Sequence, residues 1–223
     1  MNLAKYIDHT ILKPATTILE IEQLCREAAV HEFAAVCVPP PFVKRAKALL
    51  SPVPVKVATV VGFPFGYAAT EAKLAETLLA LVDGADEVDM VINLIALKMK
   101  DMDFLVKEVK MLTNVVHQKN KLIKVIVESG ILSDDELRSC CKTIGHAGID
   151  FMKTSTGYAE KGASVEAVQL MRAHLPSEVK IKASGGIRSY AFARQLVEAG
   201  ADRLGCSASV AIVNEAPGFA PGY

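Results

Sequence analysis

The segment GADEVDMVI, residues 84–92, places a glycine and an aspartate directly before a run of apolar, β-favouring residues. The same order returns in GIDFMK at residues 148–153 and in GADRLGC at residues 200–206. Each glycine follows a helical pattern, so we expect it to end a helix and the residues after it to form a strand. The recurrence predicts repeated helix–strand units.

Strands and helices are expected to alternate along the whole chain. Strands are predicted at residues 34–38, 55–61, 87–92, 122–128, 150–154, 179–183 and 203–206, with an eighth at residues 6–11. Two capping boxes, Thr17 with Glu20 and Ser133 with Glu136, mark helix starts. No linker interrupts the series, so we expect one α/β domain over residues 1–223, a (β/α)8 TIM barrel. An open doubly wound sheet is the alternative, but no G-x-G-x-x-G opens a helix after an early strand.

Composition narrows the classes of partner. The chain has 25 basic and 25 acidic residues, so no net field would attract nucleic acid or an anionic membrane. The apolar stretches are too short for a bilayer span, and residues 1–12 carry charges where a signal peptide would be apolar. An odd count of five cysteines without a C-x-x-C pair suits reduced thiols and the cytoplasm. The five histidines lack metal-ligand spacing, so neither a metal nor another cofactor is expected.

Three charged residues lie within predicted strands whose other residues look buried: Asp89, Lys153 and Lys182. One such lysine alone is more often a side chain that reaches solvent at a strand end. Three on three strands of one barrel would form a buried ionisable cluster, which suits amine catalysis because a lysine is nucleophilic only when neutral. One lysine would attack and the other would lower its pKa, and the residues alone leave the two roles open.

Glycines and hydroxyls follow the last two predicted strands and predict a phosphate site. Many barrels bind phosphate in these two loops through backbone N–H groups near helix starts. The candidate residues are Gly185, Gly186, Arg188, Gly205 and Ser207. Asp8 and Thr10 end the first predicted strand and are secondary candidates for substrate contact, although such residues equally often form a turn or a helix entry.

With these residues in place, the chain resembles the deoxyribose-phosphate aldolase family over nearly its full length. The resemblance is carried, in family order, by five motifs: IDHT at 7–10, GFP at 62–64, ADEVDMVIN at 85–93, KTSTG at 153–157 and KASGGIR at 182–188. It implies a (β/α)8 class I aldolase that needs no metal and interconverts 2-deoxy-D-ribose 5-phosphate with acetaldehyde and D-glyceraldehyde 3-phosphate, in deoxyribonucleotide and deoxyribose catabolism.

The resemblance also assigns roles to residues. Lys153 would form the Schiff base, Lys182 would lower its pKa, Asp89 would relay protons, and Tyr223 would take part in proton transfer on the enamine. Thr154 and Gly157 of the lysine motif would contact the phosphorylated sugar. Dimers are common in this family, which makes a homodimer an expectation.

The sequence differs from the family pattern at two places, and two alternative functions remain open. The glycine-rich stretch after the lysine motif reads YAEKG at 158–162, and the usual serine pair after the last strand is reduced to Ser207 and Ala208, so phosphate affinity could differ from that of the family. Lys161 would either supply a compensating positive charge near the phosphate or lie in solvent. The rival functions are another phosphosugar barrel enzyme, an isomerase or epimerase with Asp89 as base, and a non-catalytic sugar-phosphate sensor.

Overall fold

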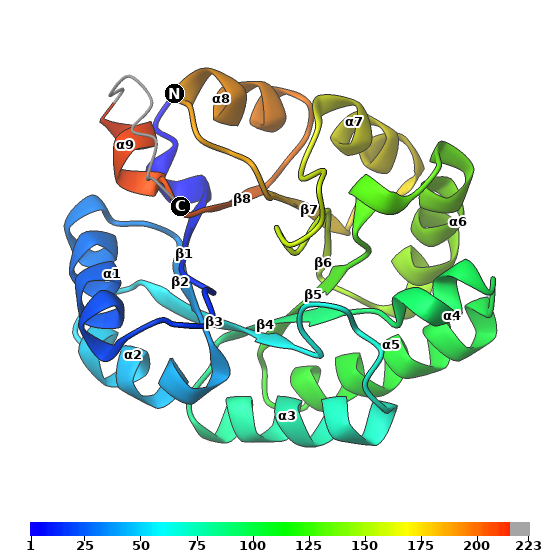
Figure 1. Cartoon of the computed structure of the whole chain (residues 1–223), viewed down its shortest axis with the longest axis horizontal. Helices are drawn as coiled ribbons and strands as arrows, with labels where there is room; N and C mark the ends of the chain where they lie inside the picture. The colour runs from blue at the N-terminus through cyan, green and yellow to red at the C-terminus, as the bar shows by residue number, and fades with distance from the viewer. Residues whose placement is uncertain (215–223) are drawn as a thin grey trace.

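A computed structural model, which describes residues 1–214, has a closed barrel of eight parallel strands in sequence order, β1 to β8 (Figure 1). The predicted (β/α)8 fold is therefore confirmed. The strands are β1 Ile7–Thr10, β2 Ala35–Val38, β3 Lys56–Val61, β4 Glu87–Val91, β5 Leu122–Ile126, β6 Phe151–Lys153, β7 Lys180–Ser184 and β8 Arg203–Cys206. The largest boundary difference is in β5, which ends two residues before the predicted limit because Glu128 adopts a left-handed backbone with φ of +54°.

Helices surround the barrel (Figure 1). They are α1 Ile18–His31, α2 Val43–Leu50, α3 Thr70–Val82, α4 Leu94–Lys98, α5 Met102–His117, α6 Asp134–Ile144, α7 Val165–His174, α8 Tyr190–Glu198 and α9 Ser209–Val213. Both predicted capping boxes are present, at the starts of α1 and α6. Within residues 1–214, no helix combines the length and the apolar character needed to cross a membrane.

The recurring glycine–aspartate pattern closes the helix–strand turns. Its glycines adopt the left-handed backbone that glycine tolerates best, with φ of +103° at Gly84, +85° at Gly148 and +113° at Gly200. Each aspartate then reaches across to the preceding strand, where its Oδ2 accepts a backbone N–H. The bonds join Asp86 to Val57 at 3.1 Å, Asp150 to Ile123 at 2.8 Å and Asp202 to Ile181 at 2.8 Å. One short motif thus ends a helix and ties two neighbouring strands.

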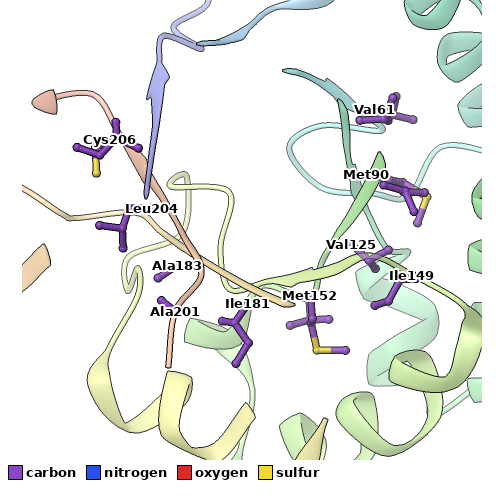
Figure 2. Close-up of a cluster of buried hydrophobic side chains, with 14 of the residues drawn as sticks. Val61, Met90, Val125, Ile149, Met152, Ile181, Ala183, Ala201, Leu204 and Cys206 are labelled. Atoms are coloured by element: carbon purple, nitrogen blue, oxygen red, sulfur yellow. The ribbon is translucent and has the colours of Figure 1, made fainter. Parts of the chain in front are cut away.

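Strand residues alternate between two environments. The outward-facing side chains form the main apolar core under the helices, and Figure 2 shows part of it, including Met90, Val125, Met152, Ile181 and Leu204. The strands are buried on both faces, which explains their nearly continuous apolar sequences. The charged residues that are buried within these strands must therefore be paired inside the barrel.

Candidate active site

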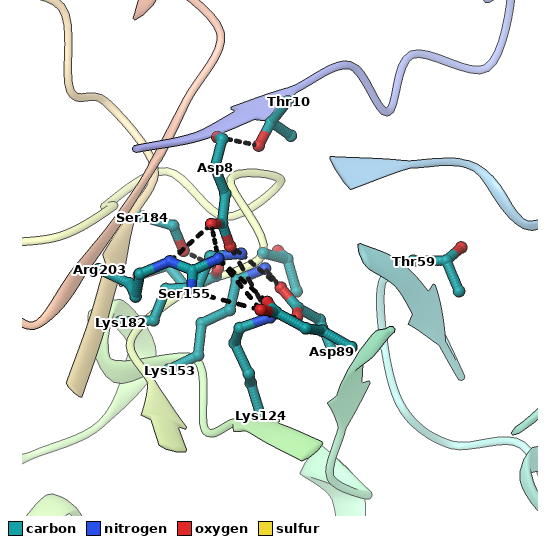
Figure 3. A network of polar contacts seen from close by, with 12 residues as sticks. Asp8, Thr10, Thr59, Asp89, Lys124, Lys153, Ser155, Lys182, Ser184 and Arg203 are labelled. Atoms are coloured by element: carbon teal, nitrogen blue, oxygen red, sulfur yellow. Dashed lines mark hydrogen bonds and ion pairs between the residues drawn. The ribbon is translucent and has the colours of Figure 1, made fainter. Parts of the chain in front are cut away.

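Asp89, Lys153 and Lys182 meet inside the barrel (Figure 3). The Nζ atoms of Lys153 and Lys182 each lie 2.7 Å from Oδ2 of Asp89. None of the three side chains is more than 3% exposed. The strand register explains the meeting, because Lys153 on β6 and Lys182 on β7 are paired neighbours and Asp89 on β4 faces the same interior. The sequence-predicted cluster therefore forms.

Four further charged residues extend this cluster: Asp8 on β1, Glu87 on β4, Lys124 on β5 and Arg203 on β8. Nζ of Lys124 lies 2.8 Å from Oδ1 of Asp89 and 2.5 Å from Oε2 of Glu87. Nζ of Lys182 lies 2.5 Å from Oδ2 of Asp8. The guanidinium of Arg203 donates to both Asp8 and Glu87. The network joins six of the eight strands: β1, β4, β5, β6, β7 and β8.

The lysines differ in how many carboxylates compensate their burial. Lys182 contacts both Asp8 and Asp89, whereas the only carboxylate partner of Lys153 within residues 1–214 is Asp89, through the oxygen that Lys182 also uses. Burial lowers the pKa of Lys153, and the positive charge of Lys182 lowers it further, against the opposing effect of Asp89. Burial would also lower the pKa of Lys182, but Asp8 and Asp89 outweigh it and raise that pKa. Of the two paired lysines, Lys153 is thus the one more readily neutral.

Lys124 and Asp89 remain charged for the same reason. Although burial disfavours its charge, Lys124 has a raised pKa because Asp89 and Glu87 flank it. Burial likewise opposes ionisation of Asp89, yet Lys124, Lys153 and Lys182 hold the pKa of this carboxyl well below its usual range. Asp89 therefore lies as an anion between Lys153, whose pKa is lowered, and Lys124, whose pKa is raised.

The opposite wall of the barrel interior is apolar. Cys37 on β2 and Ala58 and Val60 on β3 form a separate buried cluster, against which Leu12 and Phe63 pack. Burial and the nearby carboxylate of Asp89 raise the pKa of the Cys37 thiol. An apolar wall excludes water from one side of the ionic cluster and strengthens the interactions within it.

A cavity of about 160 Å³ connects Lys153 to the loops after β7 and β8. Its lining includes most of the predicted substrate-binding residues: Thr10, Gly157, Gly185, Gly186, Arg188, Gly205 and Ser207. Gly185 and Gly186 have φ of +86° and +76°, a backbone that other residues rarely adopt. A larger cavity of about 400 Å³ lies at the other end, where β5 to β7 begin, and contains none of the charged cluster. Catalytic groups of such barrels lie at the strand C-terminal ends, so the smaller cavity is the candidate site.

Two predicted substrate-binding residues, Asp8 and Thr154, do not line this cavity. Asp8 is fully buried and its carboxylate is engaged by Lys182 and Arg203 rather than lining the cavity. The hydroxyl of Thr154 lies 3.2 Å from the carbonyl oxygen of Ser184 and accepts from the backbone N–H of Ser184 at 3.0 Å, so it joins β6 to β7. Tyr223 lies outside the described residues, and its role stays a prediction.

Four further residues at this site were not predicted from the sequence: Glu87, Lys124, Arg203 and Glu128. Glu87 and Lys124 carry the same signal that selected Asp89, a charge inside an apolar strand, and that signal could have found them. Arg203 begins its strand, where an arginine ordinarily reaches solvent, and Glu128 was expected to be the last residue of β5.

Comparison with known proteins agrees with this geometry. The family description "DeoC/LacD family aldolase" matches residues 2–214. Deoxyribose-phosphate aldolases of Caldicellulosiruptor saccharolyticus and Thermococcus gammatolerans are both 49% identical to this chain, over 96% and 97% of it and 97% of each relative. The solved structure of deoxyribose phosphate aldolase from Aeropyrum pernix superposes with a TM-score of 0.89 at 33% identity, and the match covers 95% of this chain and 89% of that one. The chain belongs to the DeoC/LacD family of aldolases.

Proposed function

We propose that this protein is a class I aldolase that reversibly cleaves 2-deoxy-D-ribose 5-phosphate to acetaldehyde and D-glyceraldehyde 3-phosphate through a Schiff base on Lys153. The main support is the unequal pairing of the two lysines with carboxylates. Lys153 shares one oxygen of Asp89 with Lys182, and its pKa is lowered. A neutral amine inside a barrel is the nucleophile that such an aldolase needs. The names of the close relatives support the substrate.

The first half of the reaction forms the iminium. Neutral Lys153 adds to the aldehyde carbon of the open-chain sugar. The carbinolamine hydroxyl then leaves as water, with a proton from the ammonium of Lys182, whose Nζ shares Oδ2 of Asp89 with Lys153. The anion of Asp89 stabilises the positive charge as it moves from one nitrogen to the other.

The second half breaks the carbon–carbon bond. Lys182, now neutral, accepts the proton of the carbon-three hydroxyl directly or through water, and the bond between carbons two and three breaks as the iminium takes up its electron pair. Glyceraldehyde 3-phosphate leaves, and the acetaldehyde enamine is protonated and hydrolysed to regenerate Lys153. A positioned proton relay of this kind contributes about 10²- to 10⁴-fold to the rate. Tyr223, beyond the described residues, is proposed to assist the enamine protonation.

The remote phosphate is proposed to bind the backbone of Gly185, Gly186 and Gly205 with Ser207 and Arg188 beside it. These residues lie with Lys153 around one cavity, so phosphate binding would hold the aldehyde end in register with the amine. Thr10 and Gly157 line the same cavity and are proposed substrate contacts. Asp8 and Thr154 are proposed to act through Lys182 and Ser184, their partners.

Borohydride trapping followed by peptide mapping tests the reaction class and the residue together. Substrate plus borohydride should add mass to a peptide containing Lys153. Lys153→Ala should abolish both the label and turnover, because the other two lysines of the cluster, Lys124 and Lys182, have raised pKa values. Lys180→Ala is the matched control, because Lys180 lies on β7 next to the cluster but is exposed. Labelling at Lys182, or full turnover by Lys153→Ala, would refute the assignment.

We further propose a single domain over residues 1–223, a homodimer, and a cytoplasmic role in deoxyribonucleotide and deoxyribose catabolism. The relatives match over 97% of their own lengths, which supports one domain. The Aeropyrum pernix aldolase is described as tetrameric, which supports self-association. The five cysteines are free and buried, as suits a reducing compartment.

A further inference from the structure

Glu128 is a buried carboxylate that the proposed reaction does not use. It follows β5, is 3% exposed, and has the left-handed backbone that a non-glycine residue adopts only at a cost. Its side-chain hydrogen bonds, within residues 1–214, all come from Thr156. A buried charge held at a strained position by a single residue suggests that this contact has a function.

The contact fixes how Thr156 can interact with a ligand. The hydroxyl of Thr156 donates its one proton to Oε2 of Glu128 at 2.5 Å and accepts the backbone N–H of Tyr158 at 3.0 Å. A hydroxyl has one donor and two acceptor sites, so one acceptor site remains. Thr156 lines the cavity that contains Lys153, and its hydroxyl can therefore only accept a hydrogen bond there.

The lysine motif is also held in place around this contact. Oε1 of Glu128 accepts the backbone N–H of Thr156 at 3.2 Å, and Ser129 donates its N–H to the carbonyl of Thr154 at 2.7 Å. On the other side, the hydroxyl of Ser184 on β7 donates to the carbonyl of Ser155 at 2.5 Å. Residues 154–156 are thus clamped between β5 and β7, so Thr156 has a defined position relative to Lys153.

We infer that Glu128 is a positioning residue for the proposed aldolase, which orients Thr156 to accept a hydrogen bond from a hydroxyl group of the sugar phosphate while that substrate is bound at Lys153. The inference rests on the proposed function and deepens it. It identifies Glu128 and Thr156 as a pair that favours hydroxylated substrates, because a group that can only accept selects a partner that can donate.

A comparison of acetaldehyde with 2-deoxyribose 5-phosphate distinguishes this positioning role of Glu128 from a general structural role. Acetaldehyde forms an imine with Lys153 but has no hydroxyl group for Thr156 to bind. In Glu128→Gln, the amide can donate to the Thr156 oxygen and reverse its hydroxyl, so kcat/KM for 2-deoxyribose 5-phosphate should fall about tenfold, the effect of losing one substrate hydrogen bond. The rate of borohydride trapping of acetaldehyde should stay within about twofold of the wild-type rate, because no acceptor bond is involved.

Thr156→Val should give the same split, and it serves as the second variant if Glu128→Gln does not fold. In the double variant, Glu128→Gln should add less than about twofold to the effect of Thr156→Val, because one residue acts through the other. Equal losses with acetaldehyde and with the sugar phosphate, or independent losses that multiply in the double variant, would overturn the inference. A wild-type protein that neither traps acetaldehyde nor cleaves the sugar would instead refute the proposed function.

Discussion

Lys124, Lys153 and Lys182 lie on three adjacent strands and are all buried, yet they are not equivalent. Two carboxylates hold Lys182 charged, and two close carboxylates do so for Lys124, whereas Lys153 has one shared oxygen. Burial disfavours the charge of each lysine, and the anionic partners decide which of them has a raised and which a lowered pKa. The lowered pKa of Lys153, on which its proposed reactivity rests, is therefore set by its neighbours.

Lys182→Leu should shift the pH dependence of imine formation to higher pH. The positive charge of Lys182 lowers the pKa of Lys153, and its removal leaves Asp89 free to stabilise the protonated form of Lys153. A higher pKa means that the neutral amine appears only at higher pH. The measurement is the rate of borohydride trapping of acetaldehyde as a function of pH, with Lys180→Leu on the same strand as the control. An unchanged profile would contradict the tuning role of Lys182.

Sequence patterns predicted which residues enter the barrel better than how deep they lie. Asp8 and Thr10 are two residues apart on β1 and share its inner face, but Thr10 lines the cavity while Asp8 is buried against Lys182 and Arg203. Their depth depends on the stagger between neighbouring strands, which pairs Asp8 with Gly205, and no local pattern encodes that register. Arg203 was not predicted for the same reason. It lies at the start of its strand, and only the strand register brings it to its buried carboxylate partners Asp8 and Glu87.

Among the elements, local signals were reliable where they satisfy backbone groups. The capping boxes at Thr17 and Ser133 formed as predicted because the partners are three residues apart and need no tertiary information. The glycine–aspartate turns were recognised only in part. The sequence predicted their glycine caps, but the bond from each aspartate to the preceding strand joins residues 21 to 29 positions apart and depends on barrel closure.

Asp202→Ala should destabilise the protein although Asp202 is exposed. Its Oδ2 accepts the N–H of Ile181, and loss of this bond leaves a donor at the start of β7 unpaired. We expect the free energy of unfolding to fall by about 1–3 kcal/mol. Urea unfolding measures this, with Glu178→Ala at the same end of the barrel expected to remain within about 0.5 kcal/mol of wild type. Equal stabilities of Asp202→Ala and Glu178→Ala would show that the aspartate clamp contributes little.

On the scale of the whole molecule, the ionic cluster that is proposed to carry out catalysis also contributes to folding. It links strands from β1 to β8, which are far apart in the sequence, so these contacts form only when the barrel closes. The cluster is costly to bury, and its ion pairs offset that cost only while the carboxylates are ionised. The stability of the fold is therefore coupled to the protonation of the residues that tune Lys153.

The coupling predicts a steep loss of stability in acid. Although burial opposes it, Arg203 and Lys182 hold the pKa of Asp8 below its ordinary value, and the three lysines do so for Asp89. For carboxyls with depressed pKa values, stabilisation is complete above the unfolded-state pKa of about 3.9 and is lost as the pH falls below it. Each such carboxyl adds roughly 1.4 kcal/mol per pH unit to the slope of unfolding free energy against pH in this range.

Urea unfolding between pH 5 and 2.5, limits chosen to bracket about 3.9, should show the slope. Asp8→Asn should reduce it by about one carboxyl's share, whereas the exposed control Asp103→Asn should leave it unchanged. If the Asp8 variant retains the full slope, the cluster is not what makes the barrel acid-sensitive.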